Sequence, residues 1–592
     1  MAEALISPGV FLRENDLSQI TTGPITVGSA LIGPTVVGKV NIPTLVTSYS
    51  KYQALYGATF ISGGNTQEYL TSQAAYNYFQ QGGTSLLVTR VASGSYTSAT
   101  SSVVTNSIGN LIGSFELATL SQGTVMNNSQ GATSASNGIL PSGSSNNVRW
   151  QVTQADTASG YFTLLIRQGS DYTNGQTVLE TWTNLSLDPN QNNYIAYVIG
   201  DTAQTVAYDE SGAAYLQYSG SYPNMSNYVR VSNVYTPTPN YLNPQGQAYP
   251  QYTASIPVNG SGSANGSFGG ATGATYGGLS TNGTTSAPLN LFEAIPSVDA
   301  STPANNIQGL INSDYDVAID LLANQDSYVY NAIYAPGITN QNATSQVSAL
   351  LSTVQNRGDA IAVVDMVSYN QAISTATQAA QSYDNSYGAT YWPWVQVRST
   401  ETGRLHFVPA STIIPGVYEY NDKVSAEWFA PAGLNRGGLP TVIQPERRLT
   451  VAQRNTLYNA KVNPIAVFPG QGTVVYGQKT LQARASALDR VNVRRLLIAL
   501  KGYIGQIAET LVFEQNTAVT RNKFVSQVNP YLEYVQQRQG LYAFRVVMDE
   551  TNNTPDVIDR NLLVGAIYLQ PTRTAEFIQL DFNILPTGVT FG

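Results

Sequence analysis

Apolar side chains recur every three or four residues in two stretches of the last third of the chain. The first stretch runs from Val493 to Leu511 and the second from Phe524 to Val535. Because this spacing places the apolar side chains on one face of a helix, each stretch predicts a long helix with a buried face. A shorter stripe of the same kind predicts a helix over residues 345–356.

Strict alternation of apolar and polar residues appears near the end of the chain. It predicts a strand over residues 578–584, because successive side chains on a strand point to opposite faces. Shorter apolar runs predict strands over residues 86–91, 542–548 and 562–570. The apolar positions of the terminal strand are Ile578, Leu580, Phe582 and Ile584.

The pattern is different in residues 95–305, where Gly, Ser, Thr, Asn and Tyr dominate. Short β-like runs at 148–152, 161–166 and 194–199 are separated by turn residues, which predicts a β-rich domain. Residues 258–284 are almost entirely small and polar, and therefore predict a flexible loop or linker.

Length and composition narrow the class of protein. A chain of 592 residues predicts several domains, and 42% hydrophobic residues suffice for their cores. With no cysteine, the chain has no disulfide, thiolate metal site or cysteine nucleophile. The N-terminus lacks the features of a secretory signal, and no apolar run is long enough to cross a bilayer, so we expect no membrane insertion. Basic runs with interleaved aromatic residues are missing, so we expect no nucleic-acid contact.

Residues suited to catalysis or metal binding are sparse. His406 is the only histidine and lies in an apolar run, which favours a strand residue over a general base. Gly470 and Gly472 lack the further residues of a nucleotide-binding loop and predict a turn. Three carboxylates between residues 314 and 320 are spaced too loosely for a calcium loop. We therefore expect no enzymatic activity, no cofactor and no metal.

Short motifs with a fixed order mark the last third of the chain. They are Trp-Phe-Ala-Pro-Ala-Gly at 428–433, Asn-Arg-Gly-Gly at 435–438, Leu-Tyr at 457–458, Asn-Pro at 463–464, Phe-Pro-Gly at 468–470, Gly472, Tyr-Gly at 476–477, Val-Asn-Val-Arg-Arg at 491–495 and Phe-Glu-Gln-Asn at 513–516. In this order the motifs resemble the C-terminal core of contractile tail sheath proteins. That family forms the sleeve around the tube of contractile bacteriophages and related injection machines.

The first part of the chain and the segment before residue 428 resemble the same family. The matching pieces are Ser-Pro-Gly-Val at 7–10, Gly-Pro at 33–34, Leu-Val-Thr-Ser at 45–48, Leu-Tyr-Gly at 55–57, Gly-Gly at 82–83, Tyr-Trp-Pro-Trp-Val at 391–395 and Gly-Val-Tyr at 416–418. Trp392 departs from the tyrosine that is commoner in the family. The resemblance covers residues 1–92 and 310–592.

The resemblance implies a multidomain α+β and α/β chain. The chain is expected to have a two-part α/β sheath core, a β-rich insertion domain, and extended arms at its N- and C-termini. The expected parts are an N-terminal arm (1–22), the first part of the core (23–94), the outer insertion (95–305), the second part of the core (306–430), a C-terminal α/β domain facing the tube (431–574) and a C-terminal strand arm (575–592).

The function implied by the resemblance is that of a structural subunit of a contractile tail sheath. Such a subunit polymerises around the tail tube and contracts to drive the tube through the host envelope for genome delivery. The implied partners are further copies of the chain in stacked hexameric rings, the tail tube protein, and baseplate and terminator proteins. The implied location is the virion tail, after assembly in the host cytoplasm.

The two chain ends are the residues expected to join subunits, because sheath subunits resemble one another in donating terminal arms to sheets of their neighbours. The alternative is that each end forms a strand within its own domain. The arm residues are Ser7, Pro8, Gly9, Val10, Phe11 and Leu12 at the N-terminus, and Ile578, Leu580, Phe582 and Ile584 at the C-terminus.

Basic residues of the two long helices form the second candidate surface, expected to face the tube. Arg494 and Arg495 are neighbours on one helix and therefore diverge by about 100°. We expect one to face a neighbour and the other to pair inside the domain; the alternative is two ion pairs within the domain. Lys501, Arg521 and Lys523 extend this expected surface.

Three other functions remain open at this point. The sheath of a bacterial contractile injection system or a tailocin is the nearest alternative. An adhesin or receptor-binding protein would suit the β-rich residues 95–305, although it would not explain the core and the long helices that follow. A hydrolase would require His406 to participate in catalysis.

Overall fold

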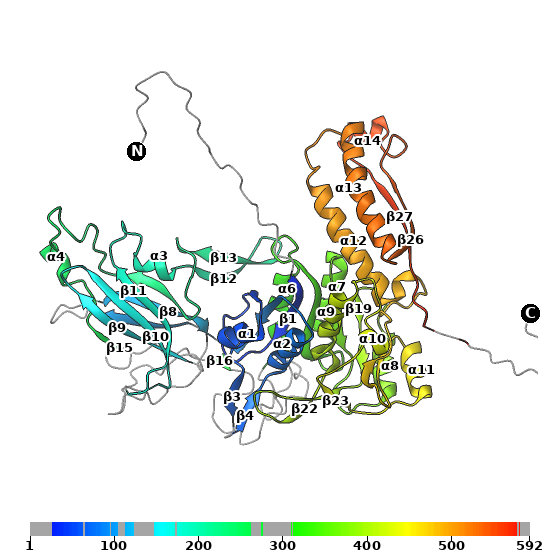
Figure 1. Cartoon of the computed structure of the whole chain (residues 1–592), viewed down its shortest axis with the longest axis horizontal. Coiled ribbons are helices and arrows are strands. Elements are labelled where there is room, and N and C mark those ends of the chain that lie inside the picture. The colour runs from blue at the N-terminus through cyan, green and yellow to red at the C-terminus, as the bar shows by residue number, and fades with distance from the viewer. Residues whose placement is uncertain are drawn as a thin grey trace, which may run out of the picture.

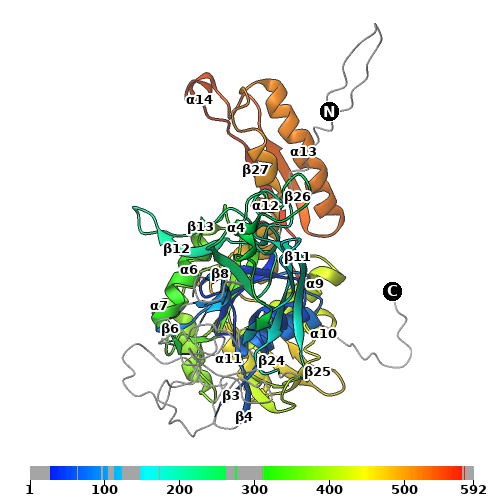
Figure 2. The ribbon, with the colours of Figure 1, turned by 90° about the vertical axis from the view of Figure 1, so that its left-hand side faces the viewer.

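The computed structural model describes residues 27–62, 65–94, 96, 98–104, 113–122, 147–171, 174–261, 274–275, 310, 312–576 and 579. These residues form a central α/β core, a β-rich domain on one side of it, and a C-terminal module of helices and strands on the other (Figure 1). Seen along the long axis, the C-terminal module stands clear of the core (Figure 2). The described part of the chain is thus a multidomain arrangement of mixed helices and sheets.

The core is built on a mainly parallel sheet. Its strand order is β19 (Gly388–Ala389), β18 (Ile361–Asp365), β17 (Tyr330–Thr339), β1 (Val27–Gly33), β5 (Leu86–Arg90) and β2 (Thr44–Val46). Only the β2–β5 pair in this order is antiparallel. Since β1 pairs with both β5 and β17, segments that lie on either side of the β-rich domain in sequence share one sheet.

Helices cover both faces of this sheet. Alternate strand residues face opposite layers: Leu31 packs against one set of helices, while Ala30 and Ile32 pack against the other. The first layer contains α1 (Tyr49–Tyr56), α2 (Leu70–Gln80) and α9 (Ile414–Val424), and the second contains α6 (Asp316–Leu322), α7 (Thr344–Arg357) and α8 (Ile373–Gln381).

Helix α7 confirms the helix that the apolar stripe predicts at residues 345–356. Val347, Leu350 and Val354 are buried on its inner face. The helix ends at Gly358, which adopts the left-handed conformation (φ 72°) common after the last helical turn. The hydrophobic pattern therefore located this helix to within one residue at each end.

Two small sheets and several short elements extend the core. One sheet is β20 (Tyr391–Trp392), β24 (Asn463–Phe468) and β25 (Gly472–Val475), and the other is β22 (Leu405–Val408), β21 (Val395–Arg398) and β23 (Val442–Pro445). Short elements beside these sheets include β3 (Thr59–Ser62), β4 (Asn65–Glu68), α10 (Gly433–Arg436), α11 (Val451–Asn459) and the 3-10 turns η2 (Asn312–Tyr315), η3 (Ala410–Thr412) and η4 (Ala487–Asp489).

The β-rich domain has its own hydrophobic core. Phe115, Trp150 and Phe162 are almost fully buried between its sheets, together with Val36 and Val37 from the loop after β1. Its sheets are β11 (Val178–Ser186), β10 (Tyr161–Gln168), β9 (Val148–Asp156) and β15 (Gly260–Ser261); β14 (Val229–Val234), β8 (Gly113–Gln122) and β7 (Ser98–Val104); and the ribbon β12 (Ala203–Tyr208) and β13 (Ala214–Ser219).

One run in this domain is helical where the sequence predicted a strand. Residues 194–199 form α3 (Ile195–Ile199), which buries Ile195 and Ile199 and ends at Gly200. A run this short carries too few residues for its periodicity to separate a buried strand from a buried helix. The strands predicted at 148–152 and 161–166 are confirmed as parts of β9 and β10.

The C-terminal module consists of two long helices covered by a hairpin. α12 (Val491–Glu509) and α13 (Ala518–Gln537) confirm the two predicted helices. β26 (Leu541–Val547) pairs with β27 (Ala566–Pro571), and α14 (Pro555–Asp559) lies in the connection between them. Leu496, Leu500, Phe524, Val528 and Leu532 form the centre of the module's core. Strand β27 begins later than the predicted residue 562, and the strand predicted at 578–584 lies outside the described residues.

Candidate assembly interface

The start of α12 is buried against the core. The guanidinium of Arg494 lies 3.8 Å above the ring of Tyr387 and donates to the carbonyl of Ser386. Arg495 donates from its two terminal nitrogens to the carboxylate of Asp422 on α9, at 2.9 and 2.5 Å. Both arginine side chains are 4% exposed. This corrects the expectation that one of them faces a neighbour, because residues of the core bind both guanidinium groups.

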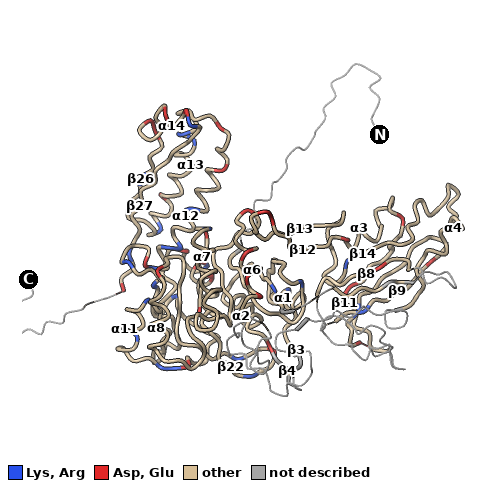
Figure 3. The backbone as a smooth tube through the Cα atoms, turned by 180° about the vertical axis from the view of Figure 1, so that it is seen from behind, with Lys and Arg blue, Asp and Glu red and all other residues tan. Residues whose placement is uncertain are grey.

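The other three basic residues differ in exposure. Arg521 is buried and donates to the side-chain oxygen of Asn516 at 2.7 Å. Lys501 is exposed but lies 3.2 Å from the hydroxyl of Tyr387, whereas Lys523 is exposed at the start of α13. Of the five residues predicted from the sequence, Lys501 and Lys523 therefore lie on the surface of a single chain. Figure 3 shows the basic positions spread over the core and the C-terminal module, with few over the β-rich domain.

The β26–β27 hairpin has open edges. Within the part of the chain that the structure describes, these two strands pair only with each other. Phe544 and Ile567 pack inward on the helices, while Tyr542 and Tyr568 are more than 60% exposed. An edge strand presents unpaired backbone N–H and C=O groups and is a template for another strand. The hairpin is thus able to accept further strands.

The chain after the hairpin returns to the core, a feature that the sequence analysis did not identify. Glu576 accepts hydrogen bonds from Arg490 and from Tyr458 of α11. The predicted C-terminal arm includes Glu576, but no spacing pointed to its partners, because they lie 86 and 118 residues earlier. The expected arm residues, Ser7, Pro8, Gly9, Val10, Phe11, Leu12, Ile578, Leu580, Phe582 and Ile584, lie outside the described residues.

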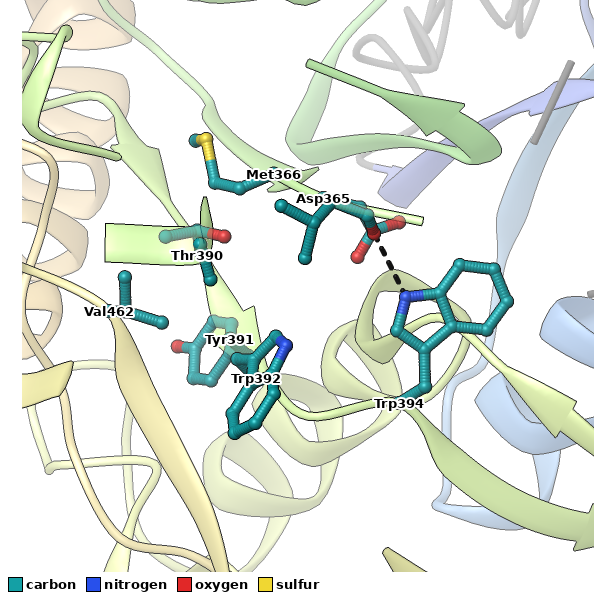
Figure 4. Close-up of a pocket in the computed structure, with 9 residues that line it drawn as sticks. Asp365, Met366, Thr390, Tyr391, Trp392, Trp394 and Val462 are labelled. Atoms are coloured by element: carbon teal, nitrogen blue, oxygen red, sulfur yellow. Dashed lines mark hydrogen bonds between the residues drawn. The ribbon is translucent and has the colours of Figure 1, made fainter. Parts of the chain in front are cut away.

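The single histidine is a strand residue, as the sequence predicted, and a separate pocket holds one buried carboxylate. His406 lies in β22 beside Arg404, and burial followed by the charge of Arg404 lowers its pKa. A small pocket at the end of β18 contains one buried carboxylate, Asp365 (Figure 4). Ser411 donates to this carboxylate from both its hydroxyl and its backbone N–H, and burial raises the pKa of Asp365 to about 7. The carboxylate therefore joins β18 to η3.

Among the residues that the structure describes, no group of three or more His, Asp or Glu side chains is placed to hold a metal ion. No helix within the described ranges combines the length and the apolar character needed to span a membrane.

Comparison with known proteins shows which class this arrangement resembles. Residues 309–481 match the model of the phage tail sheath protein central domain, and residues 484–584 match that of the phage tail sheath C-terminal domain. The two matches cover the part of the core that follows the β-rich domain and the C-terminal module. Over these segments, together 274 of its 592 residues, the chain is similar to phage tail sheath proteins.

Individual relatives agree with this similarity. The chain is 37% identical to the tail sheath protein of Vibrio phage KVP40 over 264 residues, which cover 44% of this chain and 39% of the relative. It is 42% identical to the tail sheath protein of Enterobacteria phage T4 over 185 residues, which cover 31% of this chain and 28% of the relative. This chain thus spans less than half the length of each of these curated relatives.

Solved structures give weaker similarities. The sheath tail protein Lin1278 from Listeria innocua aligns with a TM-score of 0.47 and 9% identity, over 89% of this chain and 90% of that one. The contracted sheath complex of the extracellular contractile injection system PVC aligns with a TM-score of 0.38 and 26% identity, over 43% of this chain and 71% of that one. The similarity to sheath proteins rests on the sequence matches.

Proposed function

We propose that the chain is a structural subunit of a contractile tail sheath, which polymerises around a tail tube and contracts to drive the tube through a host envelope. The observation that carries this proposal is that the two family matches fall on the part of the core after the β-rich domain and on the C-terminal module. The proposed location is the virion tail, with assembly in the host cytoplasm.

The proposed partners follow from this role. Further copies of the chain form stacked hexameric rings, the tail tube protein lies inside them, and baseplate and terminator proteins lie at the two ends. The division into terminal arms (1–22 and 575–592), a two-part core (23–94 and 306–430), an insertion (95–305) and a tube-facing domain (431–574) remains our prediction.

Strand exchange is the proposed link between subunits. The open edges of the β26–β27 hairpin support it, because an arm from a neighbour would pair with backbone groups left free there. Each net backbone hydrogen bond contributes about 0.5–1.5 kcal/mol, so an added strand of five or six bonds supplies several kcal/mol. Such links persist while domains swing between two packed arrangements, and the lower free energy of the compact arrangement drives contraction.

The surface proposed to face the tube now comprises Lys501 and Lys523, the exposed members of the basic set. Reversing the charge of Lys523 is expected to weaken binding of the purified tube protein, with the effect decreasing at high salt because exposed charges are screened. Reversing Arg560, an exposed residue paired with Asp556 elsewhere in the same module, is the matched control. Unchanged binding in the Lys523 variant would remove this part of the proposal.

Electron microscopy of the purified chain tests the main proposal. We expect hollow striated cylinders from the full chain, and no cylinders from a variant that lacks residues 1–22 and 577–592 but retains its circular dichroism spectrum. Cylinders from the truncated variant would contradict strand exchange. A chain that never polymerises and loses a binding activity when residues 95–305 are removed would favour an adhesin instead.

A further inference from the structure

The segment between β27 and residue 576, here called the strap (residues 572–576), connects the hairpin to the core. At its start, the backbone N–H of Thr572 donates to the carbonyl of Gly540, just before β26. In its middle, the side chain of Gln478 donates to the hydroxyl of Thr574 at 2.7 Å. At its end lies Glu576. The strap therefore leaves the C-terminal module and continues along the core.

Glu576 is held by three different side chains. Arg490 donates from Nε to Oε1 at 2.7 Å and from Nη2 to Oε2 at 3.0 Å, a two-point contact. Tyr458 Oη donates to Oε2 at 2.5 Å, and Gln478 Nε2 donates to Oε1 at 3.1 Å. Arg490 and Glu576 are 25% and 18% exposed. Bidentate arginine–carboxylate contacts are among the stronger polar contacts in proteins, and partial burial reduces their screening by salt.

The partners of Glu576 lie at a junction between two parts of the chain. Tyr458 belongs to α11 and Gln478 follows β25, so both belong to the core. Arg490 is the residue immediately before α12, where the chain enters the C-terminal module. The chain therefore enters the module and returns from it at one point, and Glu576 joins the two crossings. The hydrogen bonds from Arg490 and Tyr458 outweigh burial and lower the pKa of Glu576, which keeps this carboxylate charged.

We propose that the contact between Arg490 and Glu576 is a mechanical anchor, which passes tension on the chain beyond Glu576 to the core and not to the β26–β27 hairpin. Without the anchor, a pull on that chain would act on the end of β27 and open the hairpin one backbone pair at a time. A two-stranded hairpin is a weak element by itself. With the anchor, the same pull acts on α11, the segment after β25 and the first turn of α12, which are packed into the core.

This inference rests on the proposed function, because only a neighbour that holds the chain end would apply such a pull. The anchor itself is tested in the free chain, without polymerisation. Hydrogen exchange of full-length Glu576→Gln is expected to be about tenfold faster than wild type in residues 572–576, with α13 unchanged; tenfold corresponds to about 1.4 kcal/mol. Asp556→Asn, which neutralises an exposed carboxylate in the same module, is the control and is expected to leave the strap unchanged.

A pulling experiment on single molecules tests the load path. The chain has no cysteine, so handles can be attached to Ser352→Cys, exposed on α7 in the core, and to a cysteine added after Gly592. In the Glu576→Gln variant we expect an early low-force event that releases residues 541–576, a gain of roughly 120 Å at about 3.4 Å per residue. In the wild type this event is expected at clearly higher force.

The proposal is overturned if wild type and Glu576→Gln release the same length of chain at the same force. It is also overturned if hydrogen exchange in the strap is the same in both proteins. If the anchor is confirmed but the full chain forms no cylinders, the proposed function fails and the anchor stands as a property of the free chain. The two failures are therefore distinguishable.

Discussion

Arg495 of α12 and Asp422 of α9 form a two-point ion pair inside the protein, at 2.5 and 2.9 Å. The pair joins the first turns of the C-terminal module to a helix of the core. The guanidinium also lies 4.7 Å above the ring of Tyr418, whose hydroxyl is 2.8 Å from that of Tyr391. The two parts of the chain that match separate family models are thus fastened to each other by a buried polar contact.

Removal of one partner of this pair is expected to destabilise the protein strongly. Arg495→Met leaves the carboxylate of Asp422 without its cation, and breaking a buried pair in this way costs about 3–5 kcal/mol. The free energy of unfolding, measured in urea by tyrosine and tryptophan fluorescence, should fall accordingly. Arg560→Met breaks a pair whose members are 68% and 72% exposed, and is expected to change the free energy by less than about 1 kcal/mol. Equal effects of the two substitutions would contradict the structural role given to Arg495.

Glu419 is expected to make stability depend on pH. Burial, followed by the nearby charge of Asp422, raises the pKa of Glu419 from 4.5 to about 7; Glu427 acts in the same direction, whereas Arg495 and Tyr78 oppose it. Between these two pKa values the unfolded chain loses a proton that the folded chain keeps. The free energy of unfolding therefore falls as pH rises through this window.

The measurement is a comparison of Glu419→Gln with wild type at pH 5 and pH 7.5. At pH 7.5 the variant is expected to be more stable than wild type by about 1–3 kcal/mol, because no carboxylate has to ionise in a buried place. At pH 5 the two should differ little. A difference of the same size at both pH values would show that glutamine acts through packing and not through the loss of the charge.

Gly28 of β1 allows Tyr78 and Glu419 to approach the central strand. A Cβ atom at this position would lie 2.2 Å from Tyr78 Oη and 2.7 Å from a carboxylate oxygen of Glu419. Tyr78 is 1% exposed and has little room to move. Gly28→Ala is therefore expected to lower the free energy of unfolding by about 1–3 kcal/mol.

The matched control is another glycine that has open space around it. A Cβ atom at Gly502, inside α12, would have no neighbour within 4 Å. Gly502→Ala is expected to raise stability by up to about 1 kcal/mol, since alanine favours the helix. The two substitutions are thus expected to change the free energy of unfolding in opposite directions. A Gly28→Ala variant as stable as wild type would contradict the close approach of Tyr78 and Glu419 to Gly28.

Trp150 is expected to hold the β-rich domain together without affecting the C-terminal module. Its side chain is fully buried, and its ring N–H donates to Ser101 at 2.8 Å. Trp150→Ala should cost about 3–5 kcal/mol in this domain. Hydrogen exchange should accelerate in β9 and β10 while α12 keeps its wild-type rate. Trp182→Ala, at a half-buried position of β11, is the control and should have a smaller effect; faster exchange in α12 would show that the two parts do not unfold separately.

The sequence pattern predicted helices accurately where several apolar residues lie on the same face of the helix. The helices α7, α12 and α13 each present several apolar positions at helical spacing, and each is found where it was predicted. The run at residues 194–199 is too short for several apolar positions to repeat at one spacing, and it forms a helix where a strand was predicted. The resemblance of the ordered motifs to sheath proteins was likewise carried by many positions, and the family matches confirm it.

Which basic residues lie on the surface could not be predicted in this way. Helical spacing shows that Arg494 and Arg495 point in different directions, but it does not show what lies in those directions. Tyr387 and Asp422, which receive the two guanidinium groups, come from other parts of the chain. The same holds for Glu576 and its partners Arg490 and Tyr458.

The sequence by itself determined the resemblance to tail sheath proteins, the long helices and the β-rich character of the described residues between 98 and 261, because these depend on local periodicity, composition and the order of short motifs. Only the tertiary structure decided which charges are buried, where the C-terminal module is fastened to the core, and which strands keep open edges. These features depend on contacts between residues far apart in the chain, and such contacts leave no regular spacing in one sequence.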